Sequence, residues 1–345
     1  MTDIKRLGKI AGVMMLIFIA TGILSSLLMI IGVSFYPPAL GVDIPLKAQV
    51  NPQTLSFLEQ LVKALSVPDF IELLSKKNML ALIVFSLLVG LAASRVRDRA
   101  QIFISFLKAG YEVMLKVISY MMLYAPIGLG AYFAYLVGTF GTELMGSYWR
   151  VILLYYPVAI AYFIVGFSFY AYLAGGFKAI KTFWSNIIPT SLTAWGTGSS
   201  IATIPVNLEA AEKIGIPKDI RELVIPIGAT AHMDGSCLSA IVKIAFLFGL
   251  FHMDFTSPPA IAMAVVIALL SGVVMSGIPS GGFLGELLIV TFYGFPIEAL
   301  PLISMIGTLV DPPATMVNAV GDNVASMLVA RVLNGKKWMG RSEEN

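Results

Sequence analysis

The chain has 345 residues, of which 58% are hydrophobic and 12% are charged, and its formal net charge is +3. Soluble globular domains carry about 25% charged residues. The shortage of charge extends along the whole chain, so it excludes a soluble domain with one anchor and predicts an all-α integral membrane protein. The single cysteine, Cys237, excludes an intramolecular disulfide and argues against a cysteine-ligated metal site.

Six apolar runs are long enough to cross a bilayer as ordinary helices. They cover 10–34, 78–94, 110–138, 150–175, 222–252 and 300–331. The first run is too long for the core of a signal peptide, so we expect it to be retained as a span.

Lys and Arg are concentrated in alternate connections between these spans. They precede the first span and form the tail, whereas the connections at 35–66, 139–149 and 291–299 are poorer in them. The positive-inside rule therefore predicts a multi-pass protein of the cell (inner or plasma) membrane with both termini in the cytoplasm.

Two further apolar segments, 182–210 and 258–291, are interrupted near their middle. The first contains Gly-Thr-Gly-Ser-Ser at 196–200, and the second contains Ser-Gly-Ile-Pro-Ser-Gly-Gly at 276–282. Such breaks free backbone groups that hydrocarbon cannot satisfy, and a pair of them indicates a transporter binding site. We expect two re-entrant hairpins. Ordinary kinked helices are the alternative, since Gly and Pro are common in membrane spans.

Polar residues form one stripe on the last span. Asp311, Thr315, Asn318 and Asp322 follow the spacing i, i+4, i+7 and i+11, within about 60° of the helix surface. Each carboxylate in a membrane costs at least ~2.5 kcal/mol, and no Lys or Arg lies between 301 and 330 to pair with these two. A bound cation or a substrate ammonium group is the expected counter-charge.

The preceding span adds Thr230, His232 and Asp234. Thr230 and Asp234 share a helix face, and hard cations such as Na⁺ prefer oxygen ligands of these kinds. A buried polar network that only joins helices is the alternative. Lys243, on the same span, is expected to snorkel or to pair with an acid rather than to bind substrate.

Four motifs occur in an order that is typical of one family. They are Gly-Ser-Ser-Ile-Ala-Thr-Ile-Pro at 198–205, His-Met-Asp-Gly at 232–235, Gly-Ile-Pro-Ser-Gly-Gly at 277–282, and the stripe at 311–322; Tyr-Ala-Pro-Ile-Gly at 124–128 lies upstream. In this order the chain resembles the dicarboxylate/amino acid:cation symporter family, the sodium:dicarboxylate symporter-like relatives of glutamate transporters, over nearly its whole length.

The resemblance implies a role for each matched residue. Asp311 would receive the substrate amino group, Ser199, Ser200 and Asn318 would hold its α-carboxylate, and Thr315 would also contact it. The second hairpin, with Gly277 and Pro279, would be the gate. The implied cation sites comprise Asp322, Asn318, Thr230 and the backbone around Gly228 and His232, with Thr21 and Asp234 in a deeper site.

Departures from the family pattern change the expected cargo and coupling ion. Ala314 stands where the family has the arginine that binds an acidic side chain. This favours an amino acid with a neutral side chain over glutamate or a C4-dicarboxylate. His232 replaces an asparagine, and Phe18 and Gly22 replace a tyrosine and a serine of the deep Na⁺ site. We expect fewer coupled Na⁺ ions and part coupling to H⁺; a purely structural histidine is the alternative.

We therefore predict a glutamate-transporter-like fold with about six transmembrane helices and two re-entrant hairpins, in one domain over 1–345. Residues 78–138 would be residual scaffold, and 10–34 with 150–331 would be the transport part. By the resemblance two N-terminal scaffold helices are missing, through a fragment, a mis-assigned start or a shortened homologue.

The predicted function is secondary active symport of a small amino acid, coupled to Na⁺ and/or H⁺ by alternating access. We expect no cofactor besides the coupling ion, no enzyme activity and no nucleic-acid partner. The expected partners are the lipid bilayer and, as a homotrimer, two further copies of the chain. The alternatives are an acidic amino acid or dicarboxylate symporter, a non-transporting remnant, and an intramembrane aspartyl protease using two of Asp234, Asp311 and Asp322.

Overall fold

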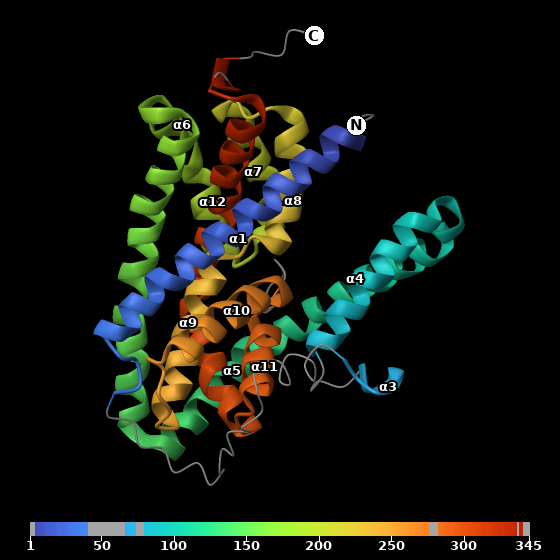
Figure 1. Cartoon of the computed structure of the whole chain (residues 1–345). Coiled ribbons are helices and arrows are strands. Elements are labelled where there is room, and N and C mark those ends of the chain that lie inside the picture. Colours follow the sequence, from blue (N-terminus) through green and yellow to red (C-terminus); the bar gives the residue numbers. More distant parts are fainter. Residues whose placement is uncertain (1–3, 41–65, 74–78, 276–281, 337, 341–345) are drawn as a thin grey trace. The chain divides into compact units, whose positions relative to one another are not determined.

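The computed structural model describes residues 4–40, 66–73, 79–275, 282–336 and 338–340. Within these ranges the regular structure is helical and includes no strand, which confirms the all-α class. The helices are α1 (Ile4–Phe35), α3 (Phe70–Leu73), α4 (Met79–Val96), α5 (Gln101–Ala161), α6 (Phe167–Thr197), α7 (Ser200–Ile214), α8 (Lys218–Ala231), α9 (Asp234–Leu250), α10 (Pro258–Met275), α11 (Gly282–Tyr293) and α12 (Leu300–Asn334), shown in Figure 1.

Several described helical stretches are long and apolar enough to cross a membrane. By length and composition they are Lys5–Phe35, Gly146–Thr197, Lys218–Leu250 and Ile297–Asn334. Shorter apolar helices lie at Val84–Val96, Pro258–Val273 and Gly282–Tyr293.

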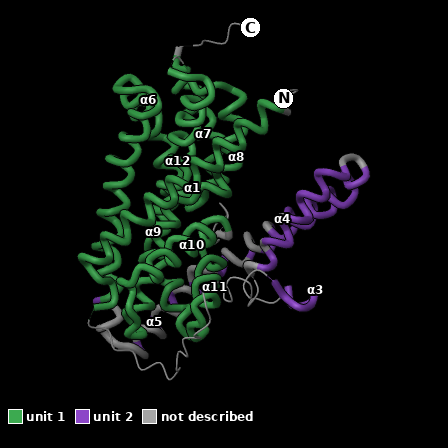
Figure 2. Tube along the Cα trace, viewed as in Figure 1, with its two compact units in different colours: residues 1–50, 147–345 green, residues 51–146 purple. Residues whose placement is uncertain are grey.

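The chain forms two compact units, which are coloured separately in Figure 2. Unit 1 comprises 1–50 and 147–345, and unit 2 comprises 51–146. In unit 2 the described elements are α3, α4, a 3₁₀ turn at Arg97–Ala100 and the first part of α5.

The expected connection at 139–149 is instead helical. Helix α5 continues through it to Ala161, where a π-helical turn at Tyr162–Gly166 leads into α6. The segment contains no proline, and each glycine costs only about 1 kcal/mol in a helix. Nothing in its covalent structure therefore ends the hydrogen-bond ladder, and the prediction of a loop there is wrong.

Helix α12 forms the centre of unit 1. It packs against α1, α6, α7, α8, α9 and α11, and these helices surround it in Figure 1. Every residue from Pro313 to Met327 is buried. Many of them are Ala, Gly, Val or Ser, whose small side chains let neighbouring helices approach closely. The polar stripe of α12 therefore faces protein from 315 onwards.

The first interrupted segment forms two packed helices joined by a tight turn. Gly175 and Gly176 leave helical geometry, Gly176 with φ of +70°, and so separate the preceding span from the rest of α6. Gly198 ends α6 in the left-handed region (φ +59°), and the Ser199 side chain caps α7 by accepting a hydrogen bond from the Ala202 amide. Helices α6 and α7 then pack against each other.

The second interrupted segment also supplies two helices that pack together, α10 and α11. The residues between them, 276–281, lie outside the described residues. Gly277 and Pro279 of the expected gate fall in this gap.

The span expected over 222–252 is not one continuous helix. It is divided into α8 and α9, with His232 and Met233 between them in non-helical conformations. The amide N–H groups of Gly235 and Ser236, at the start of α9, donate to Asn318 Oδ1 at 2.8 and 3.2 Å. A side chain of α12 thus caps the new helix end.

Contacts of Arg6 bring the start of α1, the start of α8 and the end of α12 together at one end of unit 1. Arg6 Nε lies 3.0 Å from Asp219 Oδ2 at the start of α8, and its Nη2 donates to Asn334 Oδ1 at the end of α12.

Candidate substrate and cation site

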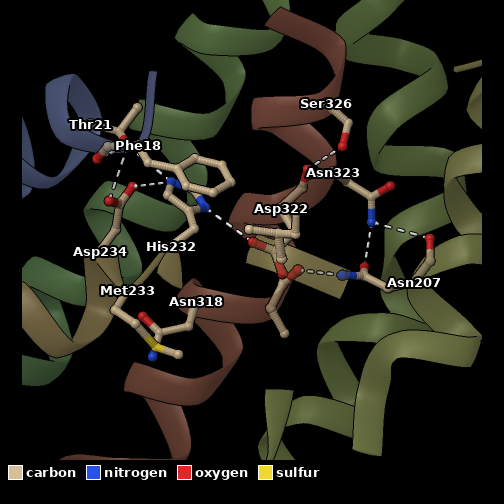
Figure 3. Close-up of polar contacts among 12 residues, drawn as sticks. Phe18, Thr21, Asn207, His232, Met233, Asp234, Asn318, Asp322, Asn323 and Ser326 are labelled. Carbon is tan, nitrogen blue, oxygen red and sulfur yellow. Dashed lines mark hydrogen bonds and ion pairs between the residues drawn. The ribbon is translucent and has the colours of Figure 1, made fainter. Parts of the chain in front are cut away.

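The break between α8 and α9 places the His232 ring inside unit 1, among α1, α9 and α12 (Figure 3). The residue is only 1% exposed. Its Nδ1 lies 3.1 Å from Asp322 Oδ1, and its Nε2 lies 3.4 Å from Asp234 Oδ2. Thr21 Oγ1 is 2.9 Å from Nε2. The imidazole therefore bridges the two carboxylates that the sequence assigned to separate cation sites.

The Asp234 carboxylate has two further hydroxyl partners. Thr21 Oγ1 donates to Oδ1 at 3.1 Å, and the Tyr162 hydroxyl donates to Oδ2 at 2.7 Å. The Phe18 ring stacks on the His232 ring with centroids 4.4 Å apart. Tyr162 belongs to the π-helical turn, a geometry that recurs at functional sites. Tyr162 was not predicted from the sequence, because a tyrosine in an apolar span is common. Its position near the middle of the span was the one local signal.

Asp322 keeps one carboxylate oxygen without a protein partner. Oδ2 is buried and makes no hydrogen bond within the described part of the chain. The Gly228 backbone lies directly against this carboxylate, with no room for a Cβ atom. A buried, unpaired carboxylate oxygen is costly, so this position fits a hard cation or a water molecule.

Two other predicted cation ligands, Thr230 and Asn318, make side-chain hydrogen bonds within the protein. Thr230 Oγ1 donates to the Ile227 carbonyl inside its own helix. Asn318 uses its oxygen to cap α9, and its Nδ2 donates to Ser236 Oγ at 3.0 Å. Among the described residues no group of three or more His, Cys, Asp or Glu side chains is arranged to hold a metal ion. A cation here would depend on carbonyl and hydroxyl oxygens as well as on Asp322.

The expected substrate residues meet where α12 passes the turn between α6 and α7. Asp311 Oδ2 lies close to Gly198 of that turn, and Thr315 Oγ1 donates to Asp311 Oδ1 at 3.5 Å. Ser199 and Ser200 are buried at the first turn of α7. A helix N-terminus can attract an anion through its amide groups, and here the start of α7 and the Asp311 carboxylate lie side by side.

Ala314 is buried, and its backbone packs against Gly235 with no space for a Cβ atom on that glycine. The position therefore adds neither charge nor a hydrogen-bonding side chain to the site.

One further buried pair lies nearby. Lys243 Nζ is 2.8 Å from Glu286 Oε1 of α11, so the expectation that Lys243 pairs with an acid is confirmed. The sequence analysis did not single out Glu286; its signal was a lone carboxylate in the apolar run at 283–290.

Broken helices that meet at buried carboxylates inside a helical membrane protein define the class of secondary transporters. Comparison of the sequence with protein families supports this class. The chain belongs to the sodium:dicarboxylate symporter family, whose model matches residues 1–332. The resemblance and the glutamate-transporter-like fold are thereby confirmed, and the family consists of transporters rather than enzymes.

Similar proteins include transporters named for different amino acids. The chain is 26% identical to the proton/sodium-glutamate symport protein of Geobacillus stearothermophilus, over 99% of this chain and 81% of that protein. It is 30% identical to the protein of the same name from Bacillus subtilis, over 97% of this chain and 78% of the relative. It is 29% identical to the neutral amino acid transporter B(0) of Bos taurus, over 74% and 48%.

Proposed function

We propose that the protein is a secondary active symporter that imports a small amino acid with a neutral side chain, coupled to Na⁺ and/or H⁺ by alternating access. The observation that carries this proposal is the Asp311 carboxylate beside the α6–α7 turn, with Ala314 next to it on α12. Relatives are named for glutamate and for neutral amino acids, so the family alone leaves both cargoes open.

The proposed substrate site binds the two groups that all α-amino acids share. Asp311 attracts the ammonium group, and the start of α7 with Ser199 and Ser200 attracts the α-carboxylate. Thr315 positions the Asp311 carboxylate through their hydrogen bond. Asn318, Gly277 and Pro279 belong to the same proposed site by the family resemblance.

The neutral side chain follows from the charges around this site. A second substrate carboxylate would need a buried cation, and Ala314 provides none. Lys243, the buried cation nearby, is already paired with Glu286. An unpaired buried carboxylate costs several kcal/mol, which selects against glutamate, aspartate and C4-dicarboxylates.

The proposed coupling ions bind around Asp322 and Asp234. Asp322, Asn318 and the backbone near Gly228 form one Na⁺ site, to which Thr230 contributes; Thr21 and Asp234 form the deeper one. His232 lies between these sites and reduces the number of Na⁺ ions bound. A neutral imidazole has one donor, so two favourable contacts from its nitrogens to carboxylates require one additional proton in the cluster. This requirement supports part coupling to H⁺.

We further propose that unit 1 is the moving transport unit and that unit 2, with 78–138, is residual scaffold of a homotrimer in the plasma membrane. Basic residues are frequent in the segments that meet around the start of α1 and the end of α12. These residues are Lys5, Arg6, Lys9, Lys178, Lys181, Lys213, Lys218, Arg221, Arg331 and Lys336. The positive-inside rule supports placing that end of unit 1 in the cytoplasm.

Uptake by liposomes that contain the purified protein tests the proposal. Labelled serine, alanine or threonine should accumulate under an inward Na⁺ or H⁺ gradient, and unlabelled aspartate, glutamate or succinate should compete weakly. Strong competition by acids would favour the acidic symporter, and absence of gradient-driven uptake would favour a non-transporting remnant.

A further inference from the structure

Lys243 and Glu286 form an ion pair deep inside unit 1. Their side chains are 2% and 3% exposed, with Nζ and Oε1 separated by 2.8 Å. Ser304 Oγ, from α12, donates to the other carboxylate oxygen, Oε2, at 2.5 Å. Both oxygens of the carboxylate thus have a partner, and α9, α11 and α12 each contribute a polar side chain to the cluster.

The backbone of α12 leaves space for this pair. Gly307 lies against both Glu286 Oε1 and Lys243 Nζ, so that a Cβ atom at this position would overlap with the carboxylate. Glu286 also lies one turn after Gly282, the first residue of α11, where the positive end of the helix dipole favours a negative charge.

The pair is close to the proposed substrate site. Gly307 and Asp311 are four residues apart on α12, which places them on the same face one turn apart. Lys243 and Glu286 are the charged groups that interact electrostatically with the Asp311 carboxylate. Asp311, Lys243 and Glu286 therefore form one group of charges at the end of the site away from Asp322.

Stability alone does not account for such a pair. Replacing a buried ion pair by apolar residues of similar size is often neutral or stabilising, whereas removing only one partner is strongly destabilising. The neighbours of Glu286 on α11, Leu287, Leu288 and Ile289, are buried and apolar, so apolar packing suits this region.

We propose that Glu286 is a specificity-determining residue: its tethered carboxylate neutralises Lys243 and so denies the buried ammonium to the side-chain carboxylate of an acidic substrate. The proposal rests on the proposed function of this site as an amino-acid site. The Glu286 carboxylate thus takes the place that the side-chain carboxylate of an acidic substrate would occupy. The substrate that fits is an amino acid without that group.

The test measures binding of neutral and acidic amino acids to Glu286→Gln in the full-length protein. Glutamine keeps the shape and removes the charge, so the Lys243 ammonium is left to recruit an anion. We expect the affinity for aspartate or glutamate, relative to that for serine, to rise about tenfold or more over wild type, which corresponds to about 1.4 kcal/mol. An unchanged ratio in a folded variant overturns the proposal.

The double variant Lys243→Met/Glu286→Gln is the matched control. Without the ammonium, the ratio should return to the wild-type value; a raised ratio in the double variant contradicts a role for Lys243. If Glu286→Gln does not fold, Glu286→Asp weakens the pair while it keeps the charge. An intermediate ratio supports the proposal, and a wild-type ratio together with a lowered melting temperature overturns it.

Different results would overturn the proposed function and the inference about Glu286. The proposed function fails if wild-type protein itself prefers acidic substrates. The inference about Glu286 fails if the ratio does not change between wild type and Glu286→Gln, or if the ratio stays raised in the double variant, whichever substrate wild type prefers.

Discussion

His232 Nδ1 lies 3.1 Å from Asp322 Oδ1, so an imidazole contacts the carboxylate that the family resemblance assigns to a Na⁺ site. The opposite ring nitrogen faces Asp234. Both carboxylates thus share one titratable neighbour, and the proposed choice between Na⁺ and a proton rests on that ring.

Replacing His232 with Asn should change the coupling ion. Asparagine contributes an amide oxygen in place of a titratable ring. We expect the variant to require less Na⁺ for half-maximal uptake, by several-fold, and to lose stimulation by an acidic external medium. In wild type, a proton bound by the cluster would take the place of a Na⁺ ion, so uptake at low Na⁺ should increase as the pH falls. Uptake into liposomes at pH 6 and pH 8 measures both effects.

His252→Asn is the matched control for this experiment. His252 lies after α9 with a positive φ of 53°, which asparagine tolerates well. This control should keep the wild-type dependence on pH and Na⁺. A purely structural His232 would instead lower the melting temperature of His232→Asn and leave its dependence on pH and Na⁺ as in wild type.

Asp322→Asn should remove stabilisation by Na⁺. Oδ2 of Asp322 is the buried carboxylate oxygen that has no protein partner within the described residues. We expect Na⁺ to raise the melting temperature of wild type and to leave that of the variant unchanged. Asp254→Asn serves as control, because this exposed carboxyl follows the far end of α9 from Asp234, where a hydrogen bond from the Thr256 side chain lowers its pKa. An equal response to Na⁺ in Asp322→Asn would show that the ion binds elsewhere.

Gly228→Ala should displace the Asp322 carboxylate. The added Cβ atom would overlap with Oδ1, and Asp322 is fully buried, so the carboxylate has little space to move. We expect weaker Na⁺ binding by tenfold or more, an effect of about 1.4 kcal/mol. Gly12→Ala in α1 is the control, since a Cβ atom there would meet nothing within 4 Å. Titration of Na⁺ against protein melting measures both variants, and equal affinities would contradict the placement of the cation.

Asn318→Ala should weaken the start of α9. It leaves the amide N–H groups of Gly235 and Ser236 without their acceptor, and each unsatisfied buried group costs about 1–3 kcal/mol. We expect a melting temperature several degrees lower and faster hydrogen exchange at residues 234–237. Asn186→Ala removes a hydrogen bond within α6 and should have a much smaller effect. Unchanged exchange at the start of α9 would show that Asn318 does not cap it.

The sequence predicted those parts of the site in which polar residues are costly. Asp311 and Asp322 stand out because an apolar helix rarely carries two carboxylates. The turn at Gly198 stands out because clustered Gly and Ser break a helix locally. In both cases the signal lies within about a dozen neighbouring residues.

The features of the fold and site that were not predicted depend on contacts between residues far apart in the sequence. The break before Asp234 is capped by Asn318, 83 residues away from Gly235, and no local motif records that contact. Glu286 is distinguished only by its contact with Lys243, which lies on another helix, 43 residues away. Tyr162 is distinguished by its hydrogen bond to Asp234, 72 residues away.

Gradient-driven uptake of competing substrates by purified protein in liposomes tests the account most directly. We predict that labelled serine, alanine or threonine accumulates under an inward Na⁺ or H⁺ gradient, and that an excess of aspartate or glutamate leaves most of this uptake intact. Preferred accumulation of aspartate, glutamate or succinate would contradict the assignment that rests on Asp311 and Ala314.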